Sequence, residues 1–575
     1  MTFSSRPPLA HQAFALALSA LALAACARPA TTVGTVPVPA PVPRADSAGP
    51  VGSERPSAAP LVREAPRNWQ LLDATANGVP GISAERAERE LLAGKKPRRA
   101  VVVAVIDGGV DTAHADLRAN LWTNARETAG NRKDDDGNGY VDDVRGWNFI
   151  GGRDGRDVRY DTYEVTRQHA LCTSQPAAGS AAKRTAGSAP APDAARCKAI
   201  AADFEKERTE AQQQLGQVRM MDDAMGRITT ILKQATGADS LTPERVAALR
   251  PTSAEVQRAQ QIYLQLAESG ITPAAIADAR KQLTSRAEYG LNAAFDPRPI
   301  VGDDYANVAE RRYGNADVMG PDAEHGTHVA GIIGAVRGNG VGIDGVAPAV
   351  KILPVRTVPD GDERDKDVAN AIRYAVDNGA NVINMSFGKK YSPNKGAVDE
   401  AVRYADSKGV LMVHAAGNDG ENLAENPNYP SPVYLNGGGR AKNWIEVGAS
   451  SWKGGDSLAA SFSNYGHDQV DVFAPGVDIL STVPGGGYER NSGTSMAAPV
   501  VTGLAALLMA YYPELSAADV KRIILASATR YADRQVARPG TGGGSVPFGS
   551  LSATGGVVNA YEALKMAAGQ GAAKP

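Results

Sequence analysis

The sequence predicts an α/β protein of three layers, in which helices cover both faces of a mainly parallel sheet, with a helical insertion added. Short continuous runs of β-branched and apolar residues are typical of strands that are buried on both faces. Helical patterns separate several of these runs, as the connections between parallel strands require. One long segment, residues 151–300, interrupts this alternation with purely helical patterns.

The first 26 residues predict an export signal. Arg6 precedes an apolar run at 13–25, which is too short to span a bilayer, and Cys26 follows directly after small residues. A Cys at this point resembles the bacterial lipobox, whose thiol is acylated; the alternative is a plain signal peptide cleaved nearby. We therefore expect residues 1–26 to be a signal peptide with a lipobox. The mature protein would be exported to a bacterial cell envelope, lipid-anchored in the outer membrane or facing the periplasm, or extracellular.

The rest of the chain divides by composition. Residues 27–66 are rich in Pro, Ala, Val and Ser without apolar periodicity, which predicts a disordered tether. The α/β pattern occupies residues 67–150 and 301–565, and residues 566–575 form a predicted disordered tail. Strands are predicted at 101–106, 350–355, 382–387, 410–416 and 445–449, with helices at 367–378 and 397–407.

The segment 151–300 is predicted to be a helical insertion, as a hairpin or a small bundle. Apolar residues recur there at spacings of three and four, which places them on one helix face: Leu215, Val218, Met221, Met225, Ile228 and Leu232. Thr242-Pro243 and Thr272-Pro273 each have the form of an N-cap followed by Pro at the first helical position. Long insertions are often tolerated without function, which favours a solvated surface decoration over a lid or a partner-binding arm.

Charge and cysteine content limit the classes of function. A formal net charge of −2 over 575 residues gives no sign of nucleic-acid binding. Besides Cys26 the chain has two cysteines, Cys172 and Cys197. An exported protein meets an oxidising compartment, so these two thiols either form a disulfide or remain separate, and the sequence leaves both alternatives open.

Three separated stretches supply the parts of a serine nucleophile system. Serine needs a base to remove its proton, and the base needs a third group that holds its tautomer and steadies its positive charge. Asp107 follows the first buried strand, His325 begins the stretch His-Gly-Thr-His, and Ser495 lies in Gly-Thr-Ser-Met-Ala-Ala-Pro. The last two stretches are expected to begin helices, and free amides at a helix start favour a developing oxyanion.

These stretches, in the order Asp, His, Ser, resemble the three signatures of the subtilase family of serine peptidases. The resemblance covers about residues 68–149 and 301–565, and it implies a subtilisin-like fold and an endopeptidase that acts on protein or peptide substrates. It departs from the family in the long insertion between Asp107 and His325, and in a 27–98 region that is short for a folded inhibitory pro-domain.

The resemblance extends to two binding segments. Asn418, at the end of Ala-Ala-Gly-Asn, matches the residue whose amide donates to the oxyanion of the tetrahedral intermediate. Ser386, Phe387 and Gly388 match the strand edge that pairs with the substrate backbone, although Phe387 is equally well explained as a core residue. His328, one turn after His325, lacks the spacing of a metalloprotease helix and is expected to be structural.

An acidic stretch after Asp107 predicts a structural calcium site. Oxygen-bearing side chains alternate there as in the first half of an EF-hand loop, although Arg145 stands where that loop ends in Glu. The alternative is a plain acidic turn. The predicted ligands of Ca²⁺ are Asp134, Asp136, Asn138, Asp142 and the carbonyl oxygen of Tyr140.

The sequence therefore predicts a secreted, membrane-anchored serine endopeptidase that works through an acyl-enzyme. We expect protein or peptide substrates, contact with a membrane through the N-terminal lipid, no nucleic acid, and a monomer. Two alternatives remain: a catalytically inactive envelope protein that holds peptides in the same cleft, and a structural lipoprotein whose helical arm recruits a partner.

Overall fold

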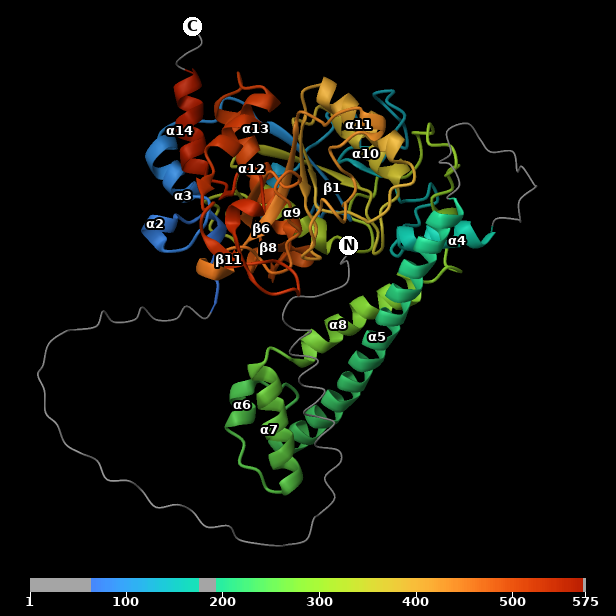
Figure 1. The fold of residues 1–575 in the computed structure, drawn as a ribbon, viewed down its shortest axis with the longest axis vertical. Helices are drawn as coiled ribbons and strands as arrows, with labels where there is room; N and C mark the ends of the chain where they lie inside the picture. Colours follow the sequence, from blue (N-terminus) through green and yellow to red (C-terminus); the bar gives the residue numbers. More distant parts are fainter. Residues whose placement is uncertain (1–63, 175–192, 572–575) are drawn as a thin grey trace, which may run out of the picture.

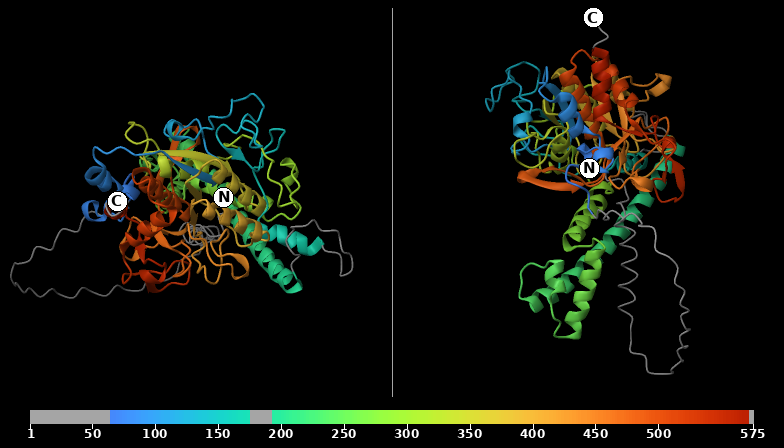
Figure 2. Two further views of the ribbon diagram at one scale, coloured as in Figure 1. Left: turned by 90° about the horizontal axis from the view of Figure 1, so that it is seen from above. Right: turned by 90° about the vertical axis from the view of Figure 1, so that its left-hand side faces the viewer.

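The computed structural model describes residues 64–174 and 193–571 (Figure 1). The predicted signal peptide, its lipobox Cys26 and all but the last three residues of the predicted tether lie outside the described residues. Two parts are visible in all views: a rounded body that contains the sheet, and an arm of helices that projects from it (Figure 2).

The body is built on a nine-stranded sheet of order β10-β13-β7-β6-β5-β4-β1-β3-β2. All neighbouring strands are parallel except β10 and β13, so the predicted mainly parallel α/β sheet is confirmed. Its strands are β1 (Val101–Asp107), β2 (Trp147–Asn148), β3 (Val350–Arg356), β4 (Val382–Met385), β5 (Leu411–Ala415), β6 (Trp444–Ser450), β7 (Val472–Pro475), β10 (Thr529–Arg530) and β13 (Gly556–Val557). Two hairpins lie outside it, β8 (Ile479–Val483) with β9 (Gly487–Asn491), and β11 (Gln535–Ala537) with β12 (Ser545–Pro547).

Alternate residues of the central strands pack into two separate hydrophobic cores, one on each face of the sheet. In β1, Val103 and Val105 belong to one core, whereas Ala104 and Ile106 belong to the other, because successive side chains of a strand point to opposite faces. The helices that cover one face are α9 (Glu324–Gly334), α12 (Thr494–Tyr511), α13 (Ala517–Ala526) and α14 (Ala560–Gly571), with the short α2 (Ala74–Asn77) and α3 (Ala84–Ala87) nearby. The opposite face is covered by α10 (Asp365–Asp377) and α11 (Lys395–Ser407) (Figure 1).

Helix α12 is the central helix of the body. Among the described residues it is the one helix long and apolar enough to cross a membrane, yet 89% of its residues are buried inside the fold. It packs on β4, β5, β6 and β7, and its apolar composition therefore serves the core.

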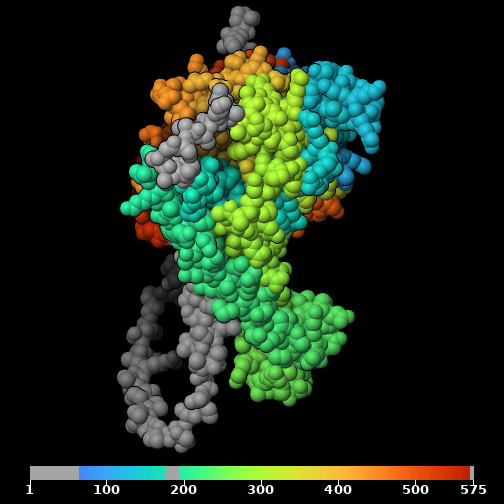
Figure 3. Space-filling model, turned by 90° about the vertical axis from the view of Figure 1, so that its right-hand side faces the viewer, coloured from blue at the N-terminus to red at the C-terminus, as the bar shows by residue number. Residues whose placement is uncertain are grey.

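The helical insertion begins with α4 (Glu164–Ser174) and continues with α5 (Ala194–Thr236), α6 (Pro243–Ala247), α7 (Ala254–Glu268) and α8 (Pro273–Ser285). Helix α5 spans 43 residues and forms the spine of the arm, along which α7 and α8 pack (Figure 3). The predicted apolar stripe is confirmed, because all six of its residues are buried in one cluster with side chains of α7 and α8.

Both predicted caps in the arm are present. The hydroxyl of Thr242 accepts a hydrogen bond from the amide of Arg245, and that of Thr272 accepts one from the amide of Ala275. These caps satisfy amides that have no intrahelical partner, which sets where α6 and α8 begin. The domain limits at 151 and 300 stay a prediction. Val158, which lies inside the predicted insertion, packs in the same core of the body as Ile150, which lies just before it.

The predicted disordered tail starts too early. Helix α14 continues to Gly571, so residues 566–571 are helical. Ala567 is fully buried and Met566 packs beside it on the core. The burial of these side chains stabilises a last turn whose small and polar composition gave no sign of order.

Candidate active site

The parallel sheet brings the three predicted catalytic stretches to one edge. Asp107 is the last residue of β1, and Asn418 follows the end of β5. Since the carboxyl ends of parallel strands meet at one edge of a sheet, the side chains that follow them lie together. Helices α9 and α12 begin at this edge with His325 and Ser495 in their first turns.

Asp107 and His325 form a buried pair. The Nδ1 atom of His325 lies 2.7 Å from Oδ1 of Asp107, which also accepts a hydrogen bond of 2.7 Å from the amide of Gly108. Asp107 is 2% exposed and His325 is 9% exposed. A carboxylate at Nδ1 holds the proton on that nitrogen and leaves Nε2 as the acceptor, which a general base requires.

Glycine after His325 permits this contact. A side chain on Gly326 would place its Cβ 2.1 Å from the carbonyl oxygen of Gly109 and 3.1 Å from Oδ1 of Asp107. Helix α9 can therefore approach the end of β1 this closely only with Gly at position 326, which explains the His-Gly pair of the motif.

Ser495 stands at the start of α12 and faces the same cavity as His325. Its hydroxyl donates a hydrogen bond of 3.1 Å to the carbonyl oxygen of Ser386. The cavity has a volume of about 250 Å³, and Ser495, His325 and Asn418 all line it. Because Ser495 lies in the first turn of α12, its own amide has no intrahelical acceptor and is available to a ligand.

The side-chain amide of Asn418 is oriented by Thr494. Its Oδ1 atom accepts hydrogen bonds from the amide of Thr494 at 2.8 Å and from the hydroxyl of the same residue at 3.0 Å. A carboxamide oxygen that accepts from a backbone amide leaves its NH₂ group on the other side, as a donor. The Nδ2 atom therefore lies beside the start of α12 and the cavity, 3.7 Å from an ideal Cβ on Gly493.

The segment from Ser386 to Gly388 continues β4 and lines the same cavity. The Ser386 hydroxyl donates to the carbonyl oxygen of Ser495 at 2.9 Å, which ties this segment to the nucleophile. Phe387 is buried in the core cluster under α10 and α11, so it has the core role that the sequence left open. A Cβ on Gly388 would lie 2.4 Å from the Asn428 side chain, so glycine is needed there for packing.

A buried histidine that sequence patterns do not reveal supports this segment. His414 is fully buried, with Nδ1 2.8 Å from Oε1 of Glu446 and Nε2 2.8 Å from the carbonyl oxygen of Phe387. These contacts hold the backbone of the cavity wall in place. They join residues from three different strands or strand ends, so no spacing within a short stretch of sequence predicts them.

His328 is structural, as predicted. Burial lowers the pKa of His328 to about 4, so its ring is neutral near pH 7. Its Nε2 atom lies 3.1 Å from the carbonyl oxygen of Glu489, which binds α9 to β9.

The acidic stretch folds into a cluster that differs from the predicted ligand set. Glu127, Asp134 and Asp136 place carboxylate oxygens within 4.8 Å of one another. Glu127 is 9% exposed, and its Oε2 atom is buried without a hydrogen-bond partner among the described residues. A buried carboxylate oxygen needs a partner, so this atom fits a cation held with Asp134 and Asp136.

Two predicted ligands have other roles. Asp142 is outside the cluster, because its carboxylate accepts hydrogen bonds from the amides of Asn131 and Arg132 and closes the loop locally. The Asn138 side chain accepts from the amide of Tyr140 and donates to Asp143. The sequence missed Glu127, which lies seven residues before the motif and reaches it only through the fold.

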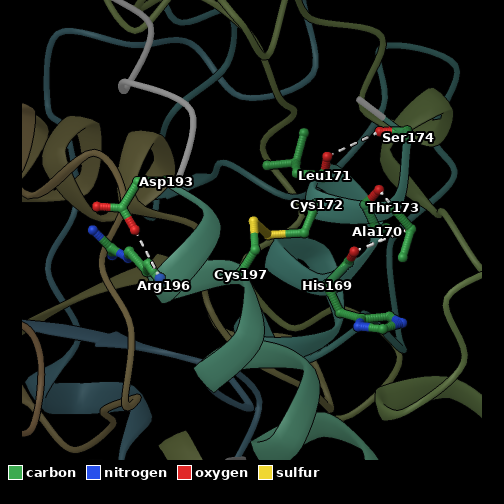
Figure 4. The surroundings of a disulfide bond; sticks show 9 residues. All are labelled: His169, Ala170, Leu171, Cys172, Thr173, Ser174, Asp193, Arg196 and Cys197. Atoms are coloured by element: carbon green, nitrogen blue, oxygen red, sulfur yellow. Dashed lines mark hydrogen bonds between the residues drawn. A yellow bond between two sulfur atoms is a disulfide. The ribbon is translucent and has the colours of Figure 1, made fainter. Parts of the chain in front are cut away.

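Cys172 and Cys197 form a disulfide between α4 and α5 (Figure 4). The bond joins the end of one helix to the first turn of the next, across 25 residues of sequence. This resolves the alternative that the sequence left open.

Comparisons with known proteins agree with this geometry. Residues 98–543 match the model of the subtilase family, peptidase family S8. Over 185 residues the chain is 48% identical to the thermophilic serine proteinase of Bacillus sp. (strain AK1), a match that covers 32% of this chain and 42% of that protein. Over 248 residues it is 37% identical to subtilisin DY of Bacillus licheniformis, covering 43% of this chain and 83% of that protein.

One solved structure, a cold adapted subtilisin-like serine proteinase, aligns at a TM-score of 0.33 and 32% identity over 40% of this chain and 76% of that chain. The family model spans most of the sequence and includes all three stretches that meet at the sheet edge. The chain therefore belongs to the subtilase family of serine endopeptidases.

Proposed function

We propose that this chain is an exported, lipid-anchored endopeptidase that cleaves protein substrates with Asp107, His325 and Ser495. The observation that carries the proposal is the 2.7 Å contact between His325 Nδ1 and Asp107 beside a cavity that Ser495 and Asn418 also line. The catalytic domain would comprise residues 67–150 and 301–565.

In the first half of the reaction, the Ser495 hydroxyl turns from the Ser386 carbonyl oxygen toward the Nε2 atom of His325. His325 takes the hydroxyl proton while Oγ bonds to the carbonyl carbon of the substrate, and Asp107 stabilises the imidazolium that forms. The C–N bond then breaks as His325 returns the proton to the leaving amine. An acyl ester on Ser495 remains.

The second half repeats these steps with water. His325 removes a proton from the water as the water oxygen bonds to the ester carbon. It then returns the proton to Ser495 Oγ as the C–Oγ bond breaks and the carboxylic acid product leaves. In both halves the carbonyl oxygen becomes negatively charged. The Nδ2 group of Asn418 and the amide of Ser495 would donate to this oxyanion, because both face the cavity at the start of α12.

The extended segment at Ser386 to Gly388 would hold the substrate backbone by strand addition. The non-catalytic alternative uses the same cleft to hold peptides without cleaving them. Reaction with an active-site probe separates the two, since only an activated serine reacts.

A fluorophosphonate probe is therefore expected to modify Ser495 at neutral pH in the wild type and not in His325→Ala, because the probe reacts only with an activated hydroxyl. The measurement is mass spectrometry of the peptide that contains Ser495, which detects the mass added by the probe. A folded protein that shows no modification would support the peptide-holding alternative.

The lipid anchor has its own test in cells. The full-length protein, detected with the probe, is expected in the detergent-extracted membrane fraction, whereas the Cys26→Ser variant is expected in the soluble fraction.

We propose further that Glu127, Asp134 and Asp136 bind a structural Ca²⁺ ion. The buried Oε2 atom of Glu127 supports this, and so does the orientation of Asp134, whose carboxylate is fixed by the amides of Asn138 and Gly139. The cluster lies in the loop between β1 and β2, and none of its three residues lines the active-site cavity, so the ion would hold this loop and take no part in cleavage.

Chelation with EDTA is expected to lower the melting temperature by several degrees relative to 1 mM CaCl₂. An ion at about 100 times its Kd stabilises the folded protein by about 2.7 kcal/mol. Glu127→Gln should abolish the difference between the two conditions, whereas Asp135→Asn, on an exposed carboxylate of the same loop, should retain it. Equal melting temperatures of the wild type in EDTA and in calcium would rule the site out.

A further inference from the structure

The insertion contributes a wall to the active-site cavity. Four residues of α5 line it together with Ser495 and His325: Asp203, Lys206, Glu207 and Glu210. Their spacings of three and four place them in one stripe along a single helix face. The part of α5 from Asp203 to Glu210 therefore lines the same cavity as Ser495, although the rest of the helix runs out along the arm (Figure 3).

Acidic side chains predominate in this cavity. Its lining includes five carboxylates, Asp203, Glu207, Glu210, Asp419 and Glu421, and three lysines, Lys206, Lys389 and Lys390. Lys389 is buried, and its ammonium is bound by Glu164 at 3.0 Å and by Asp365 at 2.8 Å. Lys390 pairs with Asp203 at 2.8 Å. Lys206 is then left to offset the other carboxylates of the cavity.

Glu207 and Glu210 differ in their surroundings. Glu207 lies 3.8 Å from the guanidinium of the buried Arg286, a long contact that offsets part of its charge. Glu210 is half-buried, and its carboxylate makes no ion pair or hydrogen bond with any of the described residues. It is the carboxylate on this wall with the most to gain from a cationic ligand.

Several contacts fix this part of α5 against the body. The disulfide Cys172–Cys197 attaches the start of the helix to α4, and Asp203 accepts hydrogen bonds from Lys390 and Tyr391. On the side away from the cavity, Ile200 and Phe204 are buried in a cluster of their own with Val165, Leu291 and Ala211. A wall held in this way presents its carboxylates at fixed positions, which selectivity requires.

We propose that α5 forms one wall of the substrate cleft and that Glu207 and Glu210 on it bind a basic side chain, Lys or Arg, of the substrate near the scissile bond. A carboxylate binds such a group by charge-assisted hydrogen bonds, which are stronger than neutral ones. This inference rests on the proposed endopeptidase function, for which it names the substrate class.

The experiment uses the full chain and quenched peptides. A positional library first identifies where the wild type prefers Lys or Arg, and two peptides are then made that differ only there, with Lys or norleucine. The ratio of their kcat/KM values is expected to fall about 10-fold or more in Glu207→Gln/Glu210→Gln, because a hydrogen bond to a charged group contributes about 1.5–3 kcal/mol.

Three comparisons make the result specific. Glu205→Gln changes an exposed carboxylate of the same helix, paired on the surface with Arg208, and should leave the ratio unchanged. Glu210→Gln alone should lower the ratio even if loss of the Arg286 partner destabilises the double variant. Fluorophosphonate labelling of Ser495 should be retained in all of them.

Labelled wild-type enzyme without a preference for Lys or Arg at any position would overturn the inference and leave the proposed function standing. An unchanged ratio in both Glu210→Gln and the double variant would do the same. Wild type that the probe does not label, and that cleaves neither peptide, would instead overturn the proposed function and the inference with it.

The pH dependence of the ratio gives a second readout. Burial raises the pKa of Glu207 to about 7, against the opposing attraction of Arg286, and Asp203, Asp362 and Lys390 also face it. Glu207 is therefore ionised above pH 7 and neutral below, so the Lys/norleucine ratio should rise as the pH increases through 7. Any pH dependence of the shared catalytic steps cancels in this ratio, since both peptides are cleaved by the same residues. A ratio with the same pH profile in wild type and Glu207→Gln would exclude Glu207 from the subsite.

Discussion

Replacement of Ser495 by alanine is expected to lower kcat by about 10⁶-fold, the size of the loss known for the same change in subtilisin. Ser495 presents its hydroxyl at the start of α12, in the cavity that His325 and Asn418 also line. Without Oγ no acyl-enzyme forms, and the remaining acceleration comes from the oxyanion donors and substrate binding alone. The fold should persist, since within the described part of the chain the Ser495 side chain makes a single hydrogen bond, to the Ser386 carbonyl oxygen.

Because the serine and the histidine would act as one unit, their single and double variants give a stricter test of this prediction. His325→Ala and the double variant should each lose about as much as Ser495→Ala, because losing either partner already stops the covalent route. Turnover of a quenched peptide is the measurement, and Ser550→Ala, the same chemical change on an exposed serine, should stay within threefold of wild type. Losses that multiplied in the double variant would contradict a shared role.

Asp107→Asn is expected to lower kcat by about 10⁴-fold, with little change in KM. The carboxylate sits 2.7 Å from His325 Nδ1 in a site where the aspartate is 2% exposed, so its negative charge is poorly screened by water. The neutral amide keeps the shape but no longer stabilises the imidazolium that forms in the transition state. The loss should therefore appear in turnover, because substrate binding involves other residues.

A nearby carboxylate provides the control. Asp322 lies three positions before His325 and forms long ion pairs with Arg159 and Lys281 at 3.7 and 3.8 Å. Asp322→Asn should lower kcat less than 10-fold. If Asp107→Asn retained turnover within 10-fold of wild type while its melting temperature was unchanged, Asp107 would not be the residue that orients His325.

The location of the catalytic residues was predictable because each motif is local. Asp107 directly follows a β-branched apolar run typical of a buried strand, and His325 is followed by Gly326, at a position where the backbone that follows β1 comes too close for any side chain. The parallel order of the sheet then required the strand ends to meet. The acidic cluster was predicted less well, because Asp142 turns back to cap its own loop and Glu127 joins Asp134 and Asp136 from outside the motif.

The insertion was predicted as helices, and only its relation to the cleft was missed. The apolar stripe from Leu215 to Leu232 revealed the bundle of the arm, because a helix face repeats at 3.6 residues. The stripe of Asp203, Glu207 and Glu210 has the same spacing, yet in sequence it looks like any solvated helix face. The expectation of a surface decoration therefore describes the outer arm but not the part of α5 from Asp203 to Glu210, which lines the cavity.

By itself, the sequence determined the α/β architecture and its main strands and pointed to the three residues proposed as nucleophile, base and acid, since these follow from local periodicity and short motifs. Tertiary structure alone decided that Cys172 bonds to Cys197, that the ring of His414 contacts the carbonyl oxygen of Phe387, and that residues of α5 line the cavity. The physical reason is that each of these contacts joins segments far apart in the sequence, and their relative positions are set by tertiary packing, which no short stretch of residues encodes.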